Sequence, residues 1–220
     1  MKEKAILSWS GGKDSALALH ELQMSGRYEV VSLITTITRD YDRVSIHGIP
    51  QNIIETQAKS IGVPVSFVYI AANATNEEYE KQFCSVLLHY KAQGVDSVVY
   101  GDIFLEALRD HREAMLNRIG IRGIFPLWKQ DTNFLAWKFI DQGFRGLLSC
   151  VDTEAMSASF AAREFDQNLL QDLPSSIDPC GERGEFHSCV YAGPIFESEL
   201  SIKRLGRVHR NQFCFANVTL

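Results

Sequence analysis

Residues 5–22 read AILSWSGGKDSALALHEL, and this stretch contains the feature that decides the fold. The apolar run at 5–7 predicts a short buried strand, and residues 16–22 have the composition of a helix. Between them stands the octet SWSGGKDS, whose small and polar residues do not suit a core. At a strand-to-helix turn the unpaired N–H groups and the helix dipole attract an anion, and glycines let the backbone approach it closely. The stretch therefore predicts a phosphate site at the end of the first strand.

The octet offers several kinds of phosphate contact. Hydroxyl groups, backbone groups and one positive charge are expected from Ser8, Ser10, Gly11, Gly12, Lys13 and Ser15. Asp14 cannot bind phosphate unless it is protonated, so it is expected to cap the helix or to help hold Mg²⁺. The spacing is neither GxxxxGK[ST] nor GxGxxG. The plain alternative is an ordinary strand–helix turn, but SGGKDS directly after a buried strand favours phosphate.

Strand-like and helix-like segments alternate over the first 125 residues. Apolar, β-branched runs predict strands at 5–7, 30–36, 65–70, 97–100 and 123–125. Helical periodicity predicts helices at about 50–61, 75–94 and 105–119, the second of which opens on Thr75 and Glu78 spaced as a capping box. This alternation is typical of an α/β protein with an open, mostly parallel five-stranded sheet of Rossmann-like topology.

In such a sheet the ligand lies at the carboxyl ends of the strands. The octet, the segment after the second strand and the end of the fourth strand should therefore converge. The residues assigned to the ligand site from the latter two places are Thr35, His47, Gly101 and Asp102. His47 fits this site and a plain loop equally well, whereas a site role is favoured for Asp102 over a helix cap. Arg112 and Glu113 are left open between site residues and a solvated ion pair.

The pattern changes beyond residue 126, and we expect two domains, 1–125 and a smaller α+β domain at 126–220. The second part predicts a helix at 132–142, a strand at 146–151, a helix at about 159–173, a turn-rich stretch at 175–188 and a hairpin at 200–220 that turns near 209–211.

Charge and composition argue against several classes of protein. The formal charge is −5, and general nucleic-acid or membrane-surface binders usually carry a basic excess. No apolar run approaches the roughly 18 residues of a membrane span, and the first strand is too short for the core of a signal peptide. Five cysteines without a CxxC pair favour reduced thiols in a cytoplasmic protein. Cys180, His187 and Cys189 fit no common zinc spacing, so no metal site built by the protein alone is predicted, and a homodimer is a fair expectation.

The sequence SGGKDS resembles the PP-loop of the ATP pyrophosphatases, which belong to the HUP class of adenine-nucleotide α-hydrolase folds. Further stretches are similar to one branch of that group, the diphthine–ammonia ligase family and its bacterial relatives. They are HG at 47–48 with QNIIETQAKSIGVPV at 51–65, YGDI at 100–103, FPLW at 125–128, DPCGERGEFHS at 178–188 and YAGPIF at 191–196. Departures from the family pattern at Arg183, Ser188 and Ala192 concern the acceptor more than the ATP chemistry.

The resemblance implies an enzyme that cleaves ATP between its α and β phosphates with the help of Mg²⁺. It would be an amide-forming ligase that adenylates a carboxylate, releases pyrophosphate and then AMP, and joins the acyl group to ammonia. The acceptor would be a small molecule or a protein that carries a modified histidine. Two alternatives stay open: a PP-loop tRNA-modifying enzyme, and a protein that binds an adenine nucleotide without turning it over.

Glu182 and Glu185 flank Gly184 in a turn, which would place two carboxylates at one mouth. Paired carboxylates bind ammonium or accept a proton from it, so these two glutamates, with Asp14 and Asp102, are the predicted catalytic groups. The plain alternative is a solvated acidic loop. With the family resemblance, the acceptor site is assigned to Cys180, Gly181, Glu182, Gly184, Glu185, Phe186 and His187.

Overall fold

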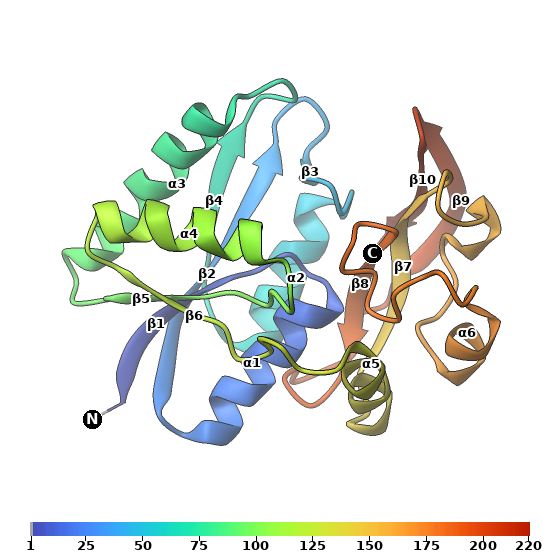
Figure 1. Ribbon diagram of the computed structural model, residues 1–220, viewed down its shortest axis with the longest axis horizontal. Helices are drawn as coiled ribbons and strands as arrows, with labels where there is room; N and C mark the ends of the chain where they lie inside the picture. Colours follow the sequence, from blue (N-terminus) through green and yellow to red (C-terminus); the bar gives the residue numbers. More distant parts are fainter. Residues whose placement is uncertain (1) are drawn as a thin grey trace.

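The computed structural model describes residues 2–220, which form two β-sheets that lie side by side (Figure 1). The first sheet contains β1 (Glu3–Ser8), β2 (Tyr28–Thr38), β3 (Arg43–Val44), β4 (Val65–Ile70), β5 (Ser97–Val99) and β6 (Arg122–Ile124). Five strands are parallel in the order β4-β2-β1-β5-β6, and the short β3 pairs antiparallel with the end of β2. The predicted α/β fold with a mostly parallel sheet is confirmed, and β3 is an addition that the sequence did not predict.

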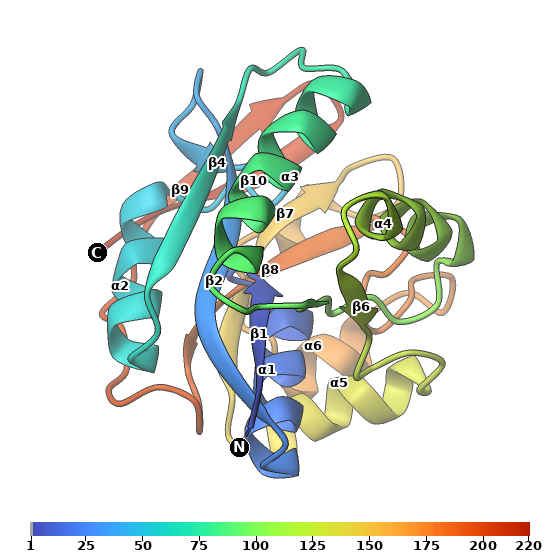
Figure 2. The same ribbon diagram turned by 90° about the vertical axis from the view of Figure 1, so that its left-hand side faces the viewer.

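Helices cover both faces of this sheet. The elements are α1 (Lys13–Ser25), α2 (Gln51–Ile61), α3 (Asn76–Lys91) and α4 (Glu106–Arg118). The helices α3 and α4 pack through Phe83 and Met115 into one hydrophobic core, while α1 and α2 pack into a second core that faces the other sheet (Figures 1 and 2). The capping box predicted for α3 is present: the Thr75 hydroxyl accepts from the Glu78 N–H at 3.2 Å, and the Glu78 carboxylate accepts from the Thr75 N–H at 2.8 Å.

The order of the parallel strands reverses beside β1. The chain runs outward from β1 to β2 and β4, and then returns to form β5 and β6 on the other side of β1. A crevice opens at the carboxyl ends of the strands at such a reversal, because the crossovers leave in opposite directions. The octet begins at the last residue of β1 and Gly101 is the second residue after β5, so both reach this crevice.

The second sheet is antiparallel, with the strand order β8-β7-β10-β9. Its strands are β7 (Arg145–Asp152), β8 (Phe186–Ala192), β9 (Lys203–Arg210) and β10 (Phe213–Thr219), accompanied by α5 (Thr132–Asp141), the 3₁₀ turn η1 (Ala158–Phe160) and α6 (Gln167–Asp172). The predicted helix at 132–142, strand at 146–151 and hairpin near 209–211 are confirmed. None of the helices between residues 2 and 220 combines the length and the apolar character that a membrane crossing requires.

One prediction in this half is wrong. The helix predicted at 159–173 is only the short turn η1 and the short helix α6, because the backbone between them pairs with β7 instead. The N–H of Ala162 donates to the Leu148 carbonyl at 2.8 Å, and the N–H of Phe165 donates to the Gly146 carbonyl at 2.8 Å. The stretch at 175–188, predicted as rich in turns, ends in the first residues of the buried strand β8.

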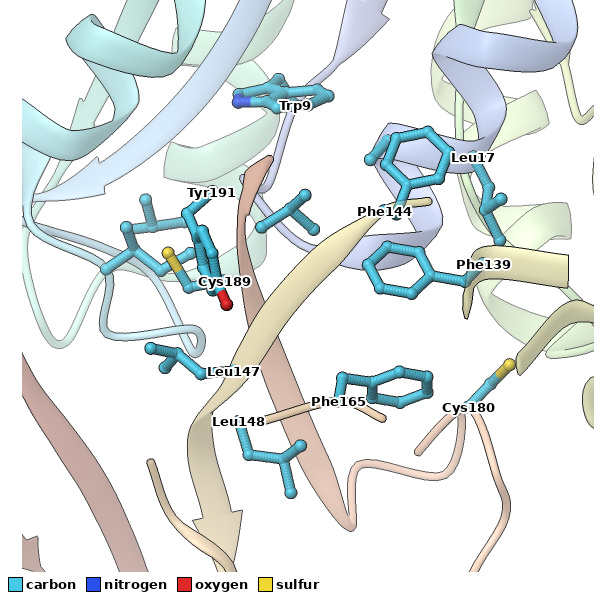
Figure 3. Packing of buried hydrophobic residues seen from close by; sticks show 14 of the residues in the cluster. Trp9, Leu17, Phe139, Phe144, Leu147, Leu148, Phe165, Cys180, Cys189 and Tyr191 are labelled. Atoms are coloured by element: carbon cyan, nitrogen blue, oxygen red, sulfur yellow. The ribbon is translucent and has the colours of Figure 1, made fainter. Parts of the chain in front are cut away.

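A single hydrophobic core joins the two sheets. Trp9 and Leu17 from the first half belong to the same buried cluster as Phe139, Phe144 and Phe165 from the second (Figure 3). The change from parallel to antiparallel sheet falls between β6 and α5, close to the predicted boundary. The division at residue 126 into separate domains stays a prediction, because this core crosses it.

Candidate functional site

A cavity of about 400 Å³ opens where the parallel strands end. Its walls come from the octet after β1, the end of β5 with the start of α4, and the loop that leads into β8. The predicted site residues that line it are Ser8, Ser10, Lys13, Asp14, Ser15, His47, Gly101, Asp102, Cys180, Gly181, Glu182, Gly184, Phe186 and His187. Segments distant in the sequence therefore meet here, as the strand-end argument predicted.

Four predicted residues do not line the cavity: Gly11, Gly12, Thr35 and Glu185. Thr35 is buried and its hydroxyl donates to the Trp9 carbonyl at 2.7 Å, so it fixes the backbone of the octet from behind. Gly11 has a φ of 78°, and a Cβ there would lie 2.6 Å from Ile54 Cδ1. The first glycine therefore provides a left-handed turn and a close contact with α2.

The octet is held in place by β8 of the second sheet. The Val190 N–H donates to the Gly11 carbonyl at 2.9 Å, and the Lys13 N–H donates to the Ser188 hydroxyl at 3.0 Å. The amide of Gln57 donates to both the Gly11 and Val190 carbonyls, at 3.1 and 2.6 Å. One of the N–H groups expected to face phosphate, that of Lys13, is thus already engaged by the protein.

Lys13 and Asp14 form a buried ion pair at the floor of the cavity. Lys13 Nζ lies 2.9 Å from both carboxylate oxygens of Asp14 and donates to the Cys180 carbonyl. Burial opposes the charge on Lys13, but the surrounding groups, Asp14 first among them, together outweigh burial and raise the pKa of the lysine. The lysine side chain is 3% exposed and that of Asp14 29%, so the carboxylate is the more accessible partner.

The backbone just after β5 lies very close to the start of α1 at this end of the cavity. A Cβ on Gly101 would lie 2.7 Å from the backbone carbon of Asp14, a distance that no real side chain adopts without a shift of the backbone. Glycine at the end of β5 is therefore required by the approach of the helix that carries Lys13 and Asp14.

Glu182 is the glutamate of the 178–185 loop that faces the cavity. Its Oε1 accepts from the N–H groups of Ile103 and Phe104, at 2.8 and 3.3 Å, at the end of the β5 segment. Burial, with repulsion from Asp14, raises the pKa of Glu182 to about 7 despite these two hydrogen bonds. A carboxyl group with such a pKa is suited to accept or donate a proton near neutral pH.

Glu185 has a different role from its neighbour. It is 7% exposed, and its two oxygens accept from the N–H groups of Asp178 and Arg183, at 3.1 and 3.0 Å. Asp178 in turn accepts from the Cys180 N–H at 2.9 Å and from the Thr132 hydroxyl at 2.8 Å. These two carboxylates fix the loop that carries Glu182 toward the cavity, and the sequence did not single out Asp178.

Asp102 forms an ion pair with Arg112, one of the two residues whose role the sequence left open. Arg112 Nε lies 2.7 Å from one oxygen of Asp102, and the Arg112 guanidinium lies 4.1 Å from the centre of the Tyr100 ring. Burial raises the pKa of Asp102, although the charge of Arg112 opposes this. Glu113 instead pairs with Arg109 at 2.8 Å, and neither of these two residues lines the cavity. Of the neighbours Arg112 and Glu113, only Arg112 lines it.

Two histidine rings lie against one another in the wall of the cavity. The rings of His47 and His187 lie 4.4 Å apart at an angle of 35°. Burial in the wall lowers the pKa of His47 to about 4, and that of His187 well below its usual value, so both rings are neutral at pH 7. Cys180 contributes its carbonyl to Lys13, while its thiol donates to the Thr132 carbonyl at 3.3 Å and burial raises its pKa.

The fold and the cavity define an α/β protein with a glycine-rich turn at the reversal point of a parallel sheet and an antiparallel sheet that closes over it. The chain belongs to the diphthamide synthase family: the family's N-terminal domain matches residues 2–123, and its C-terminal domain matches residues 131–219. A curated relative is the diphthine–ammonia ligase of Schizosaccharomyces pombe, 22% identical over 232 residues. The alignment covers 95% of this chain but 38% of that relative, so the chain spans well under half of the relative's length.

Proposed function

We propose that this chain binds ATP in the cavity and catalyses formation of an amide from a carboxylate and ammonia. The proposal rests on one observation above others: the octet and Glu182 meet at a single cavity at the strand ends. The family assignment supports a ligase, and the name of the yeast relative describes the joining of diphthine to ammonia. The family gives no support to a tRNA-modifying enzyme or to a nucleotide sensor.

In this proposal the phosphates of ATP lie along residues 8–15. The hydroxyls of Ser8, Ser10 and Ser15 are the donors, and Lys13 contributes a fixed positive charge beneath them. The carboxylates of Asp14 and Asp102 line the same cavity and are the hard oxygen ligands that Mg²⁺ prefers, so they would hold it together with the phosphates. When bound, Mg²⁺ would offset the charge that builds on the leaving pyrophosphate.

The acceptor carboxylate would attack the α-phosphate to give an acyl-adenylate and pyrophosphate. Ammonia would then attack the acyl carbon, and AMP would leave with the electron pair of the broken C–O bond. The attacking nitrogen must lose a proton, and Glu182, with a pKa of about 7, is the group that would accept it. The walls for the acceptor would be Cys180, Gly181, Gly184, Phe186 and His187, with Glu185 as a positioning residue of the loop.

Product analysis tests this function. A quenched mixture of the protein, Mg²⁺-ATP, ammonium and a candidate carboxylate should contain AMP and pyrophosphate, and labelled pyrophosphate should exchange into ATP when the carboxylate is present. ADP and free phosphate as the main products would refute the proposal, because they would come from attack at the γ-phosphate.

A further inference from the structure

A second cavity, of about 260 Å³, lies between the segment that follows β2 and the β9–β10 hairpin. Tyr41 and Arg43 contribute to it from the first half of the chain, and Arg210, Phe213 and Phe215 from the second. Its walls thus include three aromatic rings and two guanidinium groups. None of the residues assigned above to the candidate site lines it.

Neither arginine has a counter-ion among the residues that the structure describes. Arg43 is half-buried, and its Nη1 donates to the Gly48 carbonyl at 2.8 Å. Within residues 2–220, neither arginine forms an ion pair and no aspartate or glutamate lines the cavity. Burial, and after it the charge of Arg210, lowers the pKa of Arg43, which means that two like charges act on one another here. A bound anion would favour the charged form of both arginines and offset their repulsion.

The residues that line the cavity favour one kind of anion. The Arg210 guanidinium lies over the Tyr41 ring at 4.4 Å from its centre, and this cation–π contact favours that position beside the cavity. A planar carboxylate matches the forked donors of arginine, and the Phe213 and Phe215 rings offer an apolar surface that an inorganic ion would not use. A small organic carboxylate therefore suits the cavity better than free phosphate.

We propose that this cavity is a second ligand site, which binds a small organic carboxylate between Arg43 and Arg210 with its apolar body against Phe213 and Phe215. The inference does not depend on the ligase function. Ile46 lines both this cavity and the first one, so a single loop, residues 45–48, lies between the two proposed ligand sites. Ile46 itself has a φ of 68°, an unusual backbone conformation for a β-branched residue.

The test uses 2-naphthoate as a probe, with titration calorimetry on the full chain. The wild-type protein should bind the probe, and the neutral analogue 2-naphthalenemethanol should bind about tenfold more weakly, because it lacks the charge that the arginines recognise. Arg210→Gln should weaken naphthoate binding about tenfold or more, and Arg43→Gln should do the same. Lys203→Gln removes one positive charge from β9 outside the cavity and should change the affinity by less than about twofold.

Arg210 is exposed, so its replacement should leave folding intact, and this variant decides the question if Arg43→Gln proves unstable. Equal affinity of the wild type and Arg210→Gln for naphthoate would overturn the proposal, as would failure of the wild type to bind it. Competition by ATP is the further check. If ATP displaces naphthoate competitively, the two share a site and the second-site assignment is wrong.

Discussion

Replacement of Glu182 by glutamine should make the protein more stable at alkaline pH. The carboxyl group has a pKa of about 7 in the folded protein, against an ordinary value of 4.5. Below pH 4.5 the group is protonated in both the folded and the unfolded chain and has no effect on the difference between them. As the pH rises from 4.5 to 7 the unfolded chain loses this proton first, so the free energy of unfolding falls.

The size of the effect follows from the same two values. The difference between them corresponds to about 3 kcal/mol of lost stability once the pH exceeds 7. Glutamine keeps an oxygen that accepts from the Ile103 N–H but cannot ionise next to Asp14. Urea unfolding should therefore give similar free energies for the wild type and Glu182→Gln near pH 4.5, and a value higher by up to about 3 kcal/mol for the variant at pH 8.

Glu185→Gln is the matched control, because the two glutamates stand three residues apart in one loop. The oxygens of Glu185 accept from two backbone N–H groups, and an amide has only one oxygen to offer. This variant should lose about 1.5–3 kcal/mol of stability at pH 8, the opposite sign to Glu182→Gln. If Glu182→Gln is no more stable than the wild type at pH 8, the carboxylate of Glu182 is ionised and stabilised in the folded protein, and its proposed role as a base near neutral pH fails.

The remaining predictions concern residues in and around the cavity at the strand ends. Glu182→Gln should reduce the rate of amide formation by about 10²-fold or more and remove an inflection near pH 7 from the pH–rate profile, with ATP affinity nearly unchanged by calorimetry. Gly101→Ala should lower the free energy of unfolding by about 1–3 kcal/mol in urea titrations, because its Cβ would overlap the Asp14 backbone. Ser188→Ala should cost about 1–3 kcal/mol, since the buried Lys13 N–H loses its acceptor, and equal stability would mean that water replaces the hydroxyl.

Much of the fold follows from local patterns in the first half. The parallel strands are short apolar runs, and the helices between them have clear ends, such as the capping box at Thr75, so each element can be located without knowledge of its neighbours. The strand β8 is different. Its residues are buried almost throughout, so its sequence lacks the alternation of polar and apolar residues that indicates a strand. It also begins within a stretch rich in glycine and charged residues, a composition that does not predict a strand.

The candidate site was predictable in location but not in the detail of its side chains. Residues at the carboxyl ends of β1 and β5 meet because of topology, which the order of strands and helices already indicates. By contrast, Glu182 and Glu185 have the same chemistry on either side of Gly184, and only the three-dimensional path of the loop sends one to the cavity and the other to the backbone. Thr35 likewise lies behind the octet and outside the cavity. The register between β1 and β2 decides the position of its side chain, and the sequence does not reveal that register.

The shape of the octet at residues 8–15 depends on the half of the chain that would bind the acceptor. Gly11 and Lys13 are hydrogen-bonded to Val190 and Ser188 of β8, and β8 continues directly from the loop that contains Glu182. Any shift of that loop along the strand would therefore change the backbone of the octet, against which the proposed function places the phosphates. An ordinary strand–helix turn has no need of such a support, because its own sheet and helix define it. The support is useful where the octet and the loop must keep a fixed separation, as the proposed function requires: pyrophosphate would leave the α-phosphorus beside the octet, and ammonia would attack the acyl carbon of the adenylate beside the loop.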